Sequence, residues 1–524
     1  MNSLLVLFAG DLKEEAFEPL LDGKNSISLA AEQAKKFPGA AKIVLLTCGG
    51  DFSFLRDIQI EQSDKWTKKT LLEKIAELQG SGNYDFTFFA FADCPFLDPV
   101  PAASMAERHL KYAAEYSYAD GFPFGLTPEI ISPGTAAILA KINGEDEGKV
   151  ERDFLFSVIQ KDINAFDIET EISKTDLRCH RLNLCADSKR NLLLLKNFIK
   201  ASGGKLPSSF DAENIIEKQP EILRTLPSFF PIQVYGGCPQ KCSLCPYPAY
   251  TNTQGSADFM EAGIFESLID KIAAFSKDAV IDLSLWGELS LHPEKMKLIE
   301  KVILKPGLSL VIETSGVGWR KEELLKCVEF SQKKLEMQDS KKNPIAPLSW
   351  IVSLDTIDPK RYGEIRGAGF AQAQECAKTL LSLFPKDCYV QAVRTKGCED
   401  DTEKFYRYWK ENSPNGEKNI IIQKYDDFCG CLEKRQASDI SPLTRKPCWH
   451  IMRDIPVLID GTVPLCREDL SALKNTEGRR VLGNAFKDSF EQIWKNGEYY
   501  YKEHCTGNYT ELCANCDEYY TYNF

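Results

Sequence analysis

The sequence has little of what a membrane protein, an exported protein or a nucleic-acid-binding protein requires. No run approaches the roughly 18 consecutive apolar residues of a membrane-spanning helix. Acidic residues outnumber basic ones, 76 to 64, for a net charge of −12, so the chain has no overall electrostatic reason to bind nucleic acid. The first residues, MNSLLVLFAGDLKEE, contain no basic leader, and acids follow the short apolar stretch at once. We therefore expect a cytoplasmic protein that contacts neither membrane nor nucleic acid.

Histidine is also scarce, with 5 residues in 524, whereas cysteine is abundant, with 18. Without an export signal the thiols are expected to be reduced, and clustered cysteines then indicate metal ligands rather than disulfides. One concentration is the segment CPQKCSLC, and a second lies near the C-terminus. Most of the other cysteines are expected to be ordinary buried side chains.

The order of expected strands and helices predicts an α/β fold in three parts. In residues 1–205 the strands LLVLFAG, KIVLLTC and YDFTFFAFA alternate with helices, which predicts a mostly parallel, Rossmann-like sheet. A Gly/Pro-rich linker is expected at residues 201–210. Residues 215–425 supply six more strands separated by helices, enough for a partial (β/α)6 barrel of the TIM type, and residues 426–524 form a small cysteine-rich domain. The expected barrel strands are FFPIQVY, AVIDLSLW, LSLVIE, LSWIVSLD, CYVQAV and NIIIQK.

Three cysteines lie on one loop directly after the first expected barrel strand. Cys238, Cys242 and Cys245 have the spacing C-x3-C-x2-C. Three thiolates at this spacing can hold a four-iron cluster and leave one iron open to a chelating small molecule. A structural zinc site needs four ligands, and no fourth Cys or His lies nearby in the sequence. The loop therefore favours an iron–sulfur cluster over zinc.

This motif after the first barrel strand resembles the radical S-adenosylmethionine superfamily. The resemblance implies a [4Fe–4S] cluster that binds S-adenosylmethionine and takes an electron from a donor such as flavodoxin or ferredoxin. Reductive cleavage would then yield a 5′-deoxyadenosyl radical that abstracts hydrogen from a substrate. It also implies cofactor contacts in the later segments WGELS, VIETSG and SLDTIDPKRYGEIRG. The residues concerned are Gly287, Glu288, Thr314, Ser315, Ser353, Asp355 and Arg366.

Each of these residues has an expected contact. Gly287 allows close backbone approach, and Glu288 accepts hydrogen bonds from the cofactor ammonium group. Ser353 and Asp355 contact the ribose or the carboxylate, and Arg366 pairs with the methionine carboxylate. Taken alone, Glu288 or Asp355 would be interpreted as a helix cap or a turn residue. The positions that depart from the family's usual residues are Leu244, Trp286 and Leu289.

The C-terminal cysteines form a second candidate metal site. Two of them enclose an Asp-Gly turn with the spacing C-x12-G-x4-C, and two more form a C-x2-C pair; they are Cys448, Cys466, Cys513 and Cys516. Two such pairs suit zinc as well as an iron–sulfur cluster. With the following LGN and Ile-Trp segments, the pattern resembles the SPASM domain, which implies one auxiliary [4Fe–4S] cluster that relays electrons or anchors the fold. The roles of Cys429, Cys431 and Cys505 stay open.

Residues 1–205 resemble nucleotidyltransferases of the cytidylyltransferase, GT-A-like type. The matching segments include LLVLFAGD, FADCPFLDP and RLNLCADSKRNLLLL. In that family, acids equivalent to Asp93 and Asp187 hold Mg²⁺ against nucleotide phosphates. The first loop here, FAGDLKEEAFEP, has one glycine and several acids where the family has several glycines and an arginine. Acids repel phosphate, so we expect a degenerate domain that keeps the fold.

The three parts in this order resemble the spiro-SPASM family. The leading hypothesis is a radical S-adenosylmethionine enzyme whose substrate is not identified. The SPASM resemblance implies a peptide or protein substrate, and the first domain suggests a sugar or nucleotide. One alternative is a nucleotidyltransferase for surface-sugar precursors with regulatory clusters, and another is a non-catalytic zinc-binding scaffold.

Overall fold

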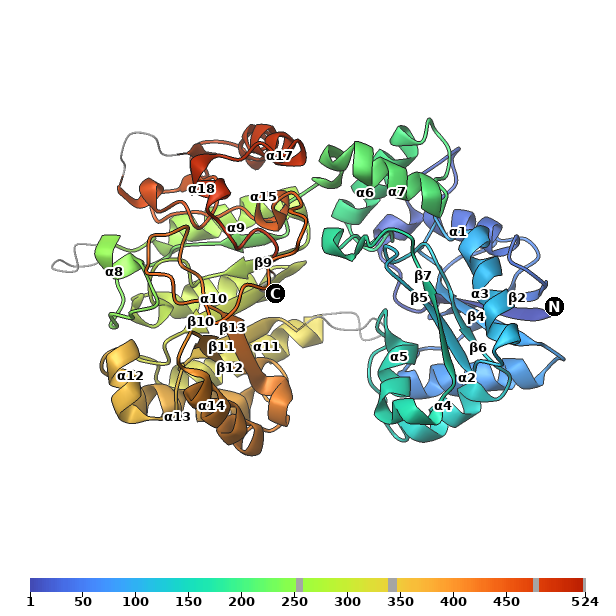
Figure 1. Cartoon of the computed structure of the whole chain (residues 1–524), viewed down its shortest axis with the longest axis horizontal. Coiled ribbons are helices and arrows are strands. Elements are labelled where there is room, and N and C mark those ends of the chain that lie inside the picture. The colour runs from blue at the N-terminus through green and yellow to red at the C-terminus, as the bar shows by residue number, and fades with distance from the viewer. Residues whose placement is uncertain (251–257, 338–345, 475–479, 522–524) are drawn as a thin grey trace. The chain divides into compact units, whose positions relative to one another are not determined.

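The structure is a computed structural model that describes residues 1–250, 258–337, 346–474 and 480–521 (Figure 1). The described residues form two compact units, one of Met1–Thr225 and one that begins at Leu226. The expected three-part division stays a prediction. None of the helices in the described ranges is both long and apolar enough to cross a membrane.

The first unit is built on a seven-stranded sheet with the order β3-β2-β1-β4-β6-β5-β7. The predicted strands near residues 4, 42 and 84 are present as β1, β2 and β4. All residues of β1 and β4 are buried, which explains their continuous apolar sequences. Strand β6 runs antiparallel to its two neighbours, and the other pairings are parallel. The strands are β1 Ser3–Ala9, β2 Ala40–Thr47, β3 Gln59–Gln62, β4 Phe86–Phe91, β5 Tyr116–Asp120, β6 Glu129–Ile131 and β7 Ile168–Ile172.

Several helices of the first unit begin at a side-chain cap, which satisfies backbone N–H groups at the helix start. Thr67 and Thr70 form a capping box at α2, and Asp98 caps α3. Residues 201–210, expected as a linker, contain the start of α7. There Ser208 is the cap, and the Asp98 carboxylate accepts a hydrogen bond from the Ser209 N–H at 2.6 Å. The helices are α1 Ser26–Ala34, α2 Lys68–Gly80, α3 Pro99–Lys111, α4 Thr135–Asn143, α5 Phe154–Ile159, α6 Lys189–Ala201 and α7 Ser209–Lys218.

The second unit contains the predicted partial barrel. Its six strands are all parallel, and their order in the sheet, β13-β12-β11-β10-β9-β8, follows their order in the sequence. Crossover helices connect them, so the carboxyl ends of all six strands meet at one edge. The predicted fold class is confirmed. The strands are β8 Phe229–Pro231, β9 Ala279–Asp282, β10 Leu308–Thr314, β11 Leu348–Ser353, β12 Cys388–Arg394 and β13 Ile420–Lys424.

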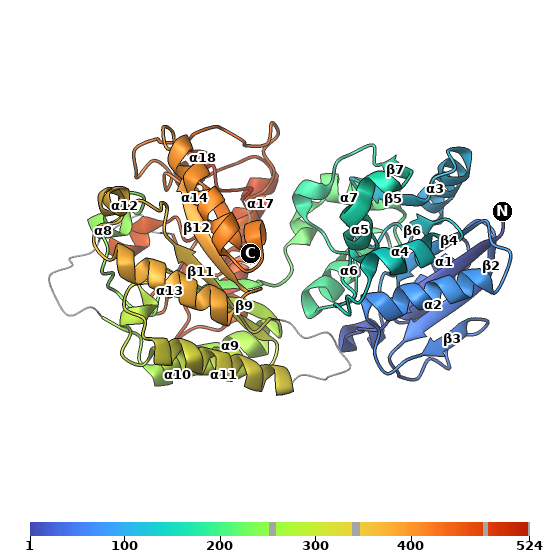
Figure 2. The same ribbon diagram turned by 90° about the horizontal axis from the view of Figure 1, so that it is seen from below.

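The crossover helices cover the outer side of this sheet. Figure 2 shows α9, α10, α11 and α13 along one side of the strands, and neighbouring helices of this set contact one another. Buried side chains of each helix face the sheet at helical spacing, for example Leu298, Ile299, Val302 and Ile303 of α10. The barrel helices are α9 Ala262–Ser276, α10 Lys295–Leu304, α11 Lys321–Met337, α12 Pro359–Ile365, α13 Phe370–Leu383 and α14 Glu399–Asn412.

The cysteine-rich tail packs against the first strand of the barrel. Phe229 and Ile232 form parallel β-bridges with Asp454 and Val457, so the tail covers the edge of the sheet. The predicted Asp-Gly turn is present, with Gly461 at φ +82° immediately before a two-stranded antiparallel sheet. The elements of this region are α8 Tyr247–Tyr250 and, in the tail, α15 Trp449–Arg453, β14 Thr462–Pro464, β15 Val481–Asn484, α16 Phe490–Asn496, α17 Glu498–Cys505 and α18 Glu511–Ala514.

Candidate functional site

The loop after β8 brings three cysteines to the mouth of a cavity of about 260 Å³ at the carboxyl ends of the barrel strands. Cys238, Cys242 and Cys245 are half-buried and all line this cavity. The loop is held by backbone bonds to the end of α12, where the Ser243 N–H donates to the Ile365 carbonyl at 2.8 Å. The structure therefore brings the three sequence-predicted cluster ligands together.

The chemistry of this donor set fits a metal cluster. Burial raises the pKa of Cys238 to about 11 and that of Cys245 to about 12, and it also raises the pKa of Cys242. Without a bound cation the three thiols therefore stay protonated. Thiolates are the metal-binding form, so cluster binding must release these protons, and the cluster's charge must offset the burial of the thiolates.

The turn after β9 lies directly against the cysteine loop. Trp286 has φ +47°, and the Glu288 N–H donates to the Gly237 carbonyl at 2.9 Å. A Cβ atom at Gly287 would clash with the Tyr235 carbonyl oxygen, so only glycine fits at this position. The sequence predicted that the backbone at Gly287 comes close to another group. In the structure that group is the backbone at the start of the cysteine loop.

Glu288 is buried and held by three donors. Its carboxylate accepts hydrogen bonds from the Thr314 hydroxyl at 2.7 Å, the Ser315 N–H at 2.8 Å and the Ser290 N–H at 3.2 Å. The Trp319 indole in turn donates to Thr314 at 2.9 Å. These bonds fix the orientation of the Glu288 side chain at the cavity wall.

The structure joins Asp355 and Arg366 to each other. The Arg366 Nε donates to the Asp355 carboxylate at 2.6 Å, and the second Asp355 oxygen accepts from the Val393 N–H at 2.9 Å. Asp355 is not among the residues that line the cavity, whereas Arg366 is. Asp355 thus orients Arg366, and its expected contact with a ribose or carboxylate stays a prediction. Arg366 also donates to the Gln240 side chain at 3.4 Å.

The sequence analysis missed the polar side chains on the inner wall of the barrel. Glu313 of β10 accepts hydrogen bonds from the Ser353 hydroxyl at 2.7 Å and from the Gln391 amide at 2.8 Å. Burial raises the pKa of Asp282 to about 6, and repulsion from Glu313 adds to the shift. A polar residue near the end of each apolar strand was the feature of the sequence that could have indicated this polar wall. Further polar residues that line the cavity include Gln423, Lys424, Asp426 and Arg467.

A second, smaller cavity gathers the C-terminal cysteines. All four cysteines of the predicted auxiliary site line it, and so does Cys429, which the sequence left open. Cys431 is exposed and Cys505 is half-buried, and neither is among the lining residues. The four predicted ligands come from the start of α15, the end of β14 and the α18 region: Cys448, Cys466, Cys513 and Cys516.

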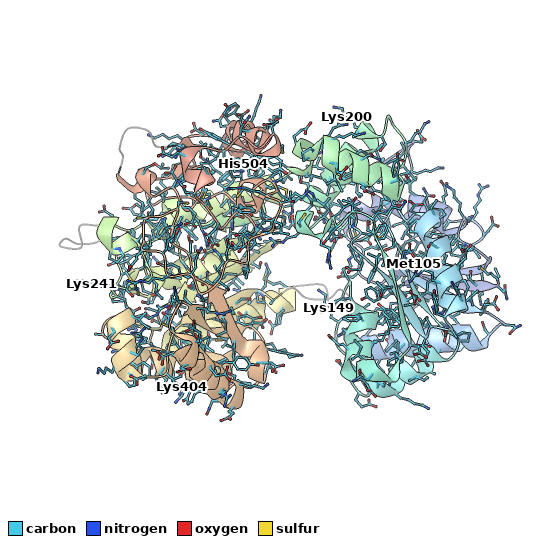
Figure 3. All side chains as sticks on the ribbon, in the orientation of Figure 1. Met105, Lys149, Lys200, Lys241, Lys404 and His504 are labelled. Carbon is cyan, nitrogen blue, oxygen red and sulfur yellow. The ribbon has the colours of Figure 1, made fainter. Side chains whose placement is uncertain are left out.

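The polar atoms around this second cavity fit a bound cluster. Backbone N–H groups of Glu468 and Glu518 donate to the Cys466 and Cys516 sulfurs at 3.2 and 3.3 Å. His504, near the end of α17 (Figure 3), is buried, and neither ring nitrogen has a hydrogen-bond partner among the described residues. Buried polar groups rarely stay unpaired, so a sulfide-bearing group in the cavity would supply the missing partner.

The first unit brings Asp93 and Asp187 together, as the nucleotidyltransferase resemblance implies, but around an arginine. Arg152 donates to both Asp93 oxygens at 2.8 and 2.6 Å and to Asp187 at 3.2 Å. Its guanidinium also lies 4.6 Å from the centre of the Phe91 ring. The position between the two acids is thus filled by a fixed positive charge, and these residues do not fit an Mg²⁺ ion.

Residues 448–517 match the family model of SPASM, described as an iron–sulfur cluster-binding domain. The chain therefore contains a SPASM domain. A protein of Treponema pallidum (strain Nichols), described as uncharacterized, is 35% identical over 383 residues, which are 71% of this chain and 99% of the relative. The chain belongs to the family of that relative.

Two solved structures are similar to this chain. A cytidylyltransferase from Leptospira borgpetersenii is 18% identical and covers 42% of this chain and 95% of its own, with a TM-score of 0.36. SuiB of Streptococcus suis, bound to the precursor peptide SuiA, is 14% identical and covers 55% of this chain and 70% of its own, with a TM-score of 0.39. SuiB is also solved with S-adenosylmethionine.

Proposed function

We propose that this enzyme cleaves S-adenosylmethionine reductively at the cysteine-loop cavity and uses the product to abstract hydrogen from a substrate. The observation that carries the proposal is the convergence of the cysteine loop, Glu288, Thr314 and Arg366 on one cavity. When bound by the three cysteines, a [4Fe–4S] cluster would supply the electron that splits the sulfonium into methionine and a 5′-deoxyadenosyl radical.

The chain's own residues would orient the cofactor. The Glu288 carboxylate, fixed by its three donors, would accept a hydrogen bond from the cofactor ammonium group. Arg366, held in place by Asp355, would pair with the cofactor carboxylate. Ser353 would contact the ribose. Asp282 and Glu313 then remain on the inner wall to bind a polar part of the substrate.

The substrate class rests on the domain content. The SPASM domain supports a peptide or protein substrate, because domains of this kind often occur in enzymes that modify them. The first unit would allow a sugar or nucleotide instead. The nucleotidyltransferase alternative is weakened, because Arg152 lies where the transferase resemblance implies a metal. The electron would come from a flavodoxin or ferredoxin.

We propose one auxiliary [4Fe–4S] cluster in the second cavity, held by Cys448, Cys466, Cys513 and Cys516. Ligation of all four irons would leave no open iron, so the site would serve as an electron relay or structural anchor rather than as a substrate-binding centre. Zinc at both cysteine sites is the alternative, and metal analysis after anaerobic expression separates the two.

The Glu288→Gln variant tests the cofactor site. The amide keeps the shape of the side chain but removes the charge that would pair with the cofactor ammonium. A hydrogen bond to a charged group is worth about 1.5–3 kcal/mol, so we expect the Kd for S-adenosylmethionine to rise about 10- to 100-fold. Anaerobic equilibrium dialysis with the iron-loaded protein measures this.

Glu364→Gln is the matched control, because Glu364 is half-exposed and pairs with Arg361 away from the cavity. It should leave the Kd unchanged. Unchanged iron content and thermal stability of Glu288→Gln would exclude a folding defect. An unaltered Kd in that variant would contradict the assigned role of Glu288.

A further inference from the structure

We propose that Arg445 and His504 donate hydrogen bonds to the cluster in the second cavity, and that the charge of Arg445 raises the reduction potential of that cluster. This inference rests on the proposed auxiliary cluster. Both side chains line the second cavity together with the four predicted ligands. Neither residue belongs to the cysteine pattern from which the site was predicted, and Arg445 precedes the domain match that begins at residue 448.

The Arg445 side chain is held in place beside the cavity. Its guanidinium carbon lies 4.2 Å from the centre of the Tyr509 ring and 4.4 Å from that of the Tyr519 ring. Contacts of a cation with aromatic rings are attractive, and a planar guanidinium suits them. One Nη atom of Arg445 also donates to the Cys513 carbonyl at 2.6 Å. The guanidinium is therefore fixed to the backbone of a predicted cluster ligand.

Both side chains carry buried nitrogens that lack a partner. The Nε of Arg445 has no hydrogen-bond partner among the described residues, and the same holds for the two ring nitrogens of His504. The His504 ring packs edge-on against Tyr509, with 4.9 Å between the ring centres. A buried donor without an acceptor is costly, so we expect the group bound in the cavity to accept these hydrogen bonds. The sulfur atoms of an iron–sulfur cluster are suitable acceptors.

The charges that line the second cavity make Arg445 important. Among the lining residues that the structure describes, Arg445 is the one with a fixed positive charge, whereas Glu468 and Glu518 contribute carboxyl groups. Each of these acids has another cation as its partner: Arg467 lies 2.9 Å from Glu468, and Lys424 pairs with Glu518. The contacts of Arg445 are instead two rings and a carbonyl. Its charge is therefore available to the bound group.

This arrangement favours the reduced state of the cluster. A four-iron cluster with four thiolate ligands is negatively charged, and reduction adds one more negative charge. A fixed cation therefore stabilises the reduced state more than the oxidised state, and hydrogen bonds to the sulfurs act in the same direction. The electron comes from the flavodoxin or ferredoxin of the proposed function, and no bond of the protein forms or breaks. The cluster thus becomes an easier electron acceptor, as an electron relay requires.

The test uses the full chain with Cys238, Cys242 and Cys245 replaced by alanine, so that the auxiliary cluster holds the remaining iron. Electron paramagnetic resonance of samples poised at known potentials gives the midpoint potential. Arg445→Gln should retain about four irons per chain and have a more negative midpoint potential. We expect the ratio of oxidised to reduced cluster at a given potential to rise at least tenfold, which is a shift of about 59 mV for one electron.

Three further variants separate the charge from the hydrogen bonds. Arg445→Lys keeps the charge but not the Nε–H, so its potential should fall less than that of Arg445→Gln. His504→Phe keeps the ring packing against Tyr509 but removes the ring N–H, and it should also lower the potential. Arg435→Gln is the matched control and should leave the potential unchanged, because Arg435 is exposed, pairs with Glu433 and lines neither cavity.

An unchanged midpoint potential in iron-loaded Arg445→Gln would overturn the inference, as would an equal shift in Arg435→Gln. If Arg445→Gln binds no iron, Arg445→Lys and His504→Phe decide in its place, and an unchanged potential in both would overturn the inference. A separate outcome bears on the proposed auxiliary cluster. If the alanine background with all C-terminal cysteines intact bound no iron, the auxiliary cluster itself would be excluded.

Discussion

Replacing Cys238, Cys242 and Cys245 together with alanine will remove one of two clusters and abolish the formation of 5′-deoxyadenosine. We expect iron to fall from about eight to about four per chain, because the auxiliary cysteines lie in a separate cavity and keep their cluster. The product falls to background because no other described group of residues brings three cysteines to the S-adenosylmethionine cavity. Iron analysis and chromatography after reduction measure the two effects.

A matched control replaces three cysteines that line neither cavity, Cys48, Cys179 and Cys431. This variant should keep about eight irons and full cleavage activity. Cleavage that persists in the first variant, or loss of all iron from it, would contradict the assignment of two independent sites.

The second large effect is a loss of stability of the first unit, which we expect on replacing Arg152. Arg152→Ala leaves Asp93 and Asp187 facing each other without their shared cation, and Asp93 is almost fully buried. Removing one partner of a buried ion pair costs about 3 kcal/mol or more. We therefore expect the free energy of unfolding of the first unit to fall by about that amount in urea denaturation of the full chain.

Arg178→Ala is the control for this prediction, because its side chain is exposed while it pairs with Asp120 and Asp176. It should change the stability by less than about 1 kcal/mol. Added Mg²⁺ should restore part of the stability of Arg152→Ala, since the two carboxylates become a site for a hard cation. Stabilisation of the wild-type chain by Mg²⁺ would contradict the conclusion that Arg152 occupies this place.

The sequence predicted best those features that are formed by residues close together in the chain. The six barrel strands were recognisable because both faces of a parallel sheet are buried, which makes each strand a short apolar run between helices. The cysteine loop was recognisable because its ligands share one turn. Gly287 was recognisable from its place at the end of a strand, although the partner that excludes a Cβ there, Tyr235, lies far away in sequence.

The contacts that the sequence did not reveal are made between distant segments. Arg152 is 59 residues from Asp93, and nothing local marks it as the partner of two acids. Asp355 was predicted to contact the cofactor. The structure adds a contact that the sequence did not reveal, because its carboxylate accepts a hydrogen bond from Arg366. Cys429 was left open because the segment CGC is too short to supply two ligands, and the structure uses only its first cysteine at the cavity.

The most direct measurement of the central claim is anaerobic reconstitution of the wild-type chain, followed by reduction in the presence of S-adenosylmethionine. We predict about eight irons per chain, present as two [4Fe–4S] clusters, and the appearance of 5′-deoxyadenosine. Two zinc ions and no iron after anaerobic expression, or a fully iron-loaded protein that releases no 5′-deoxyadenosine on reduction, would contradict it.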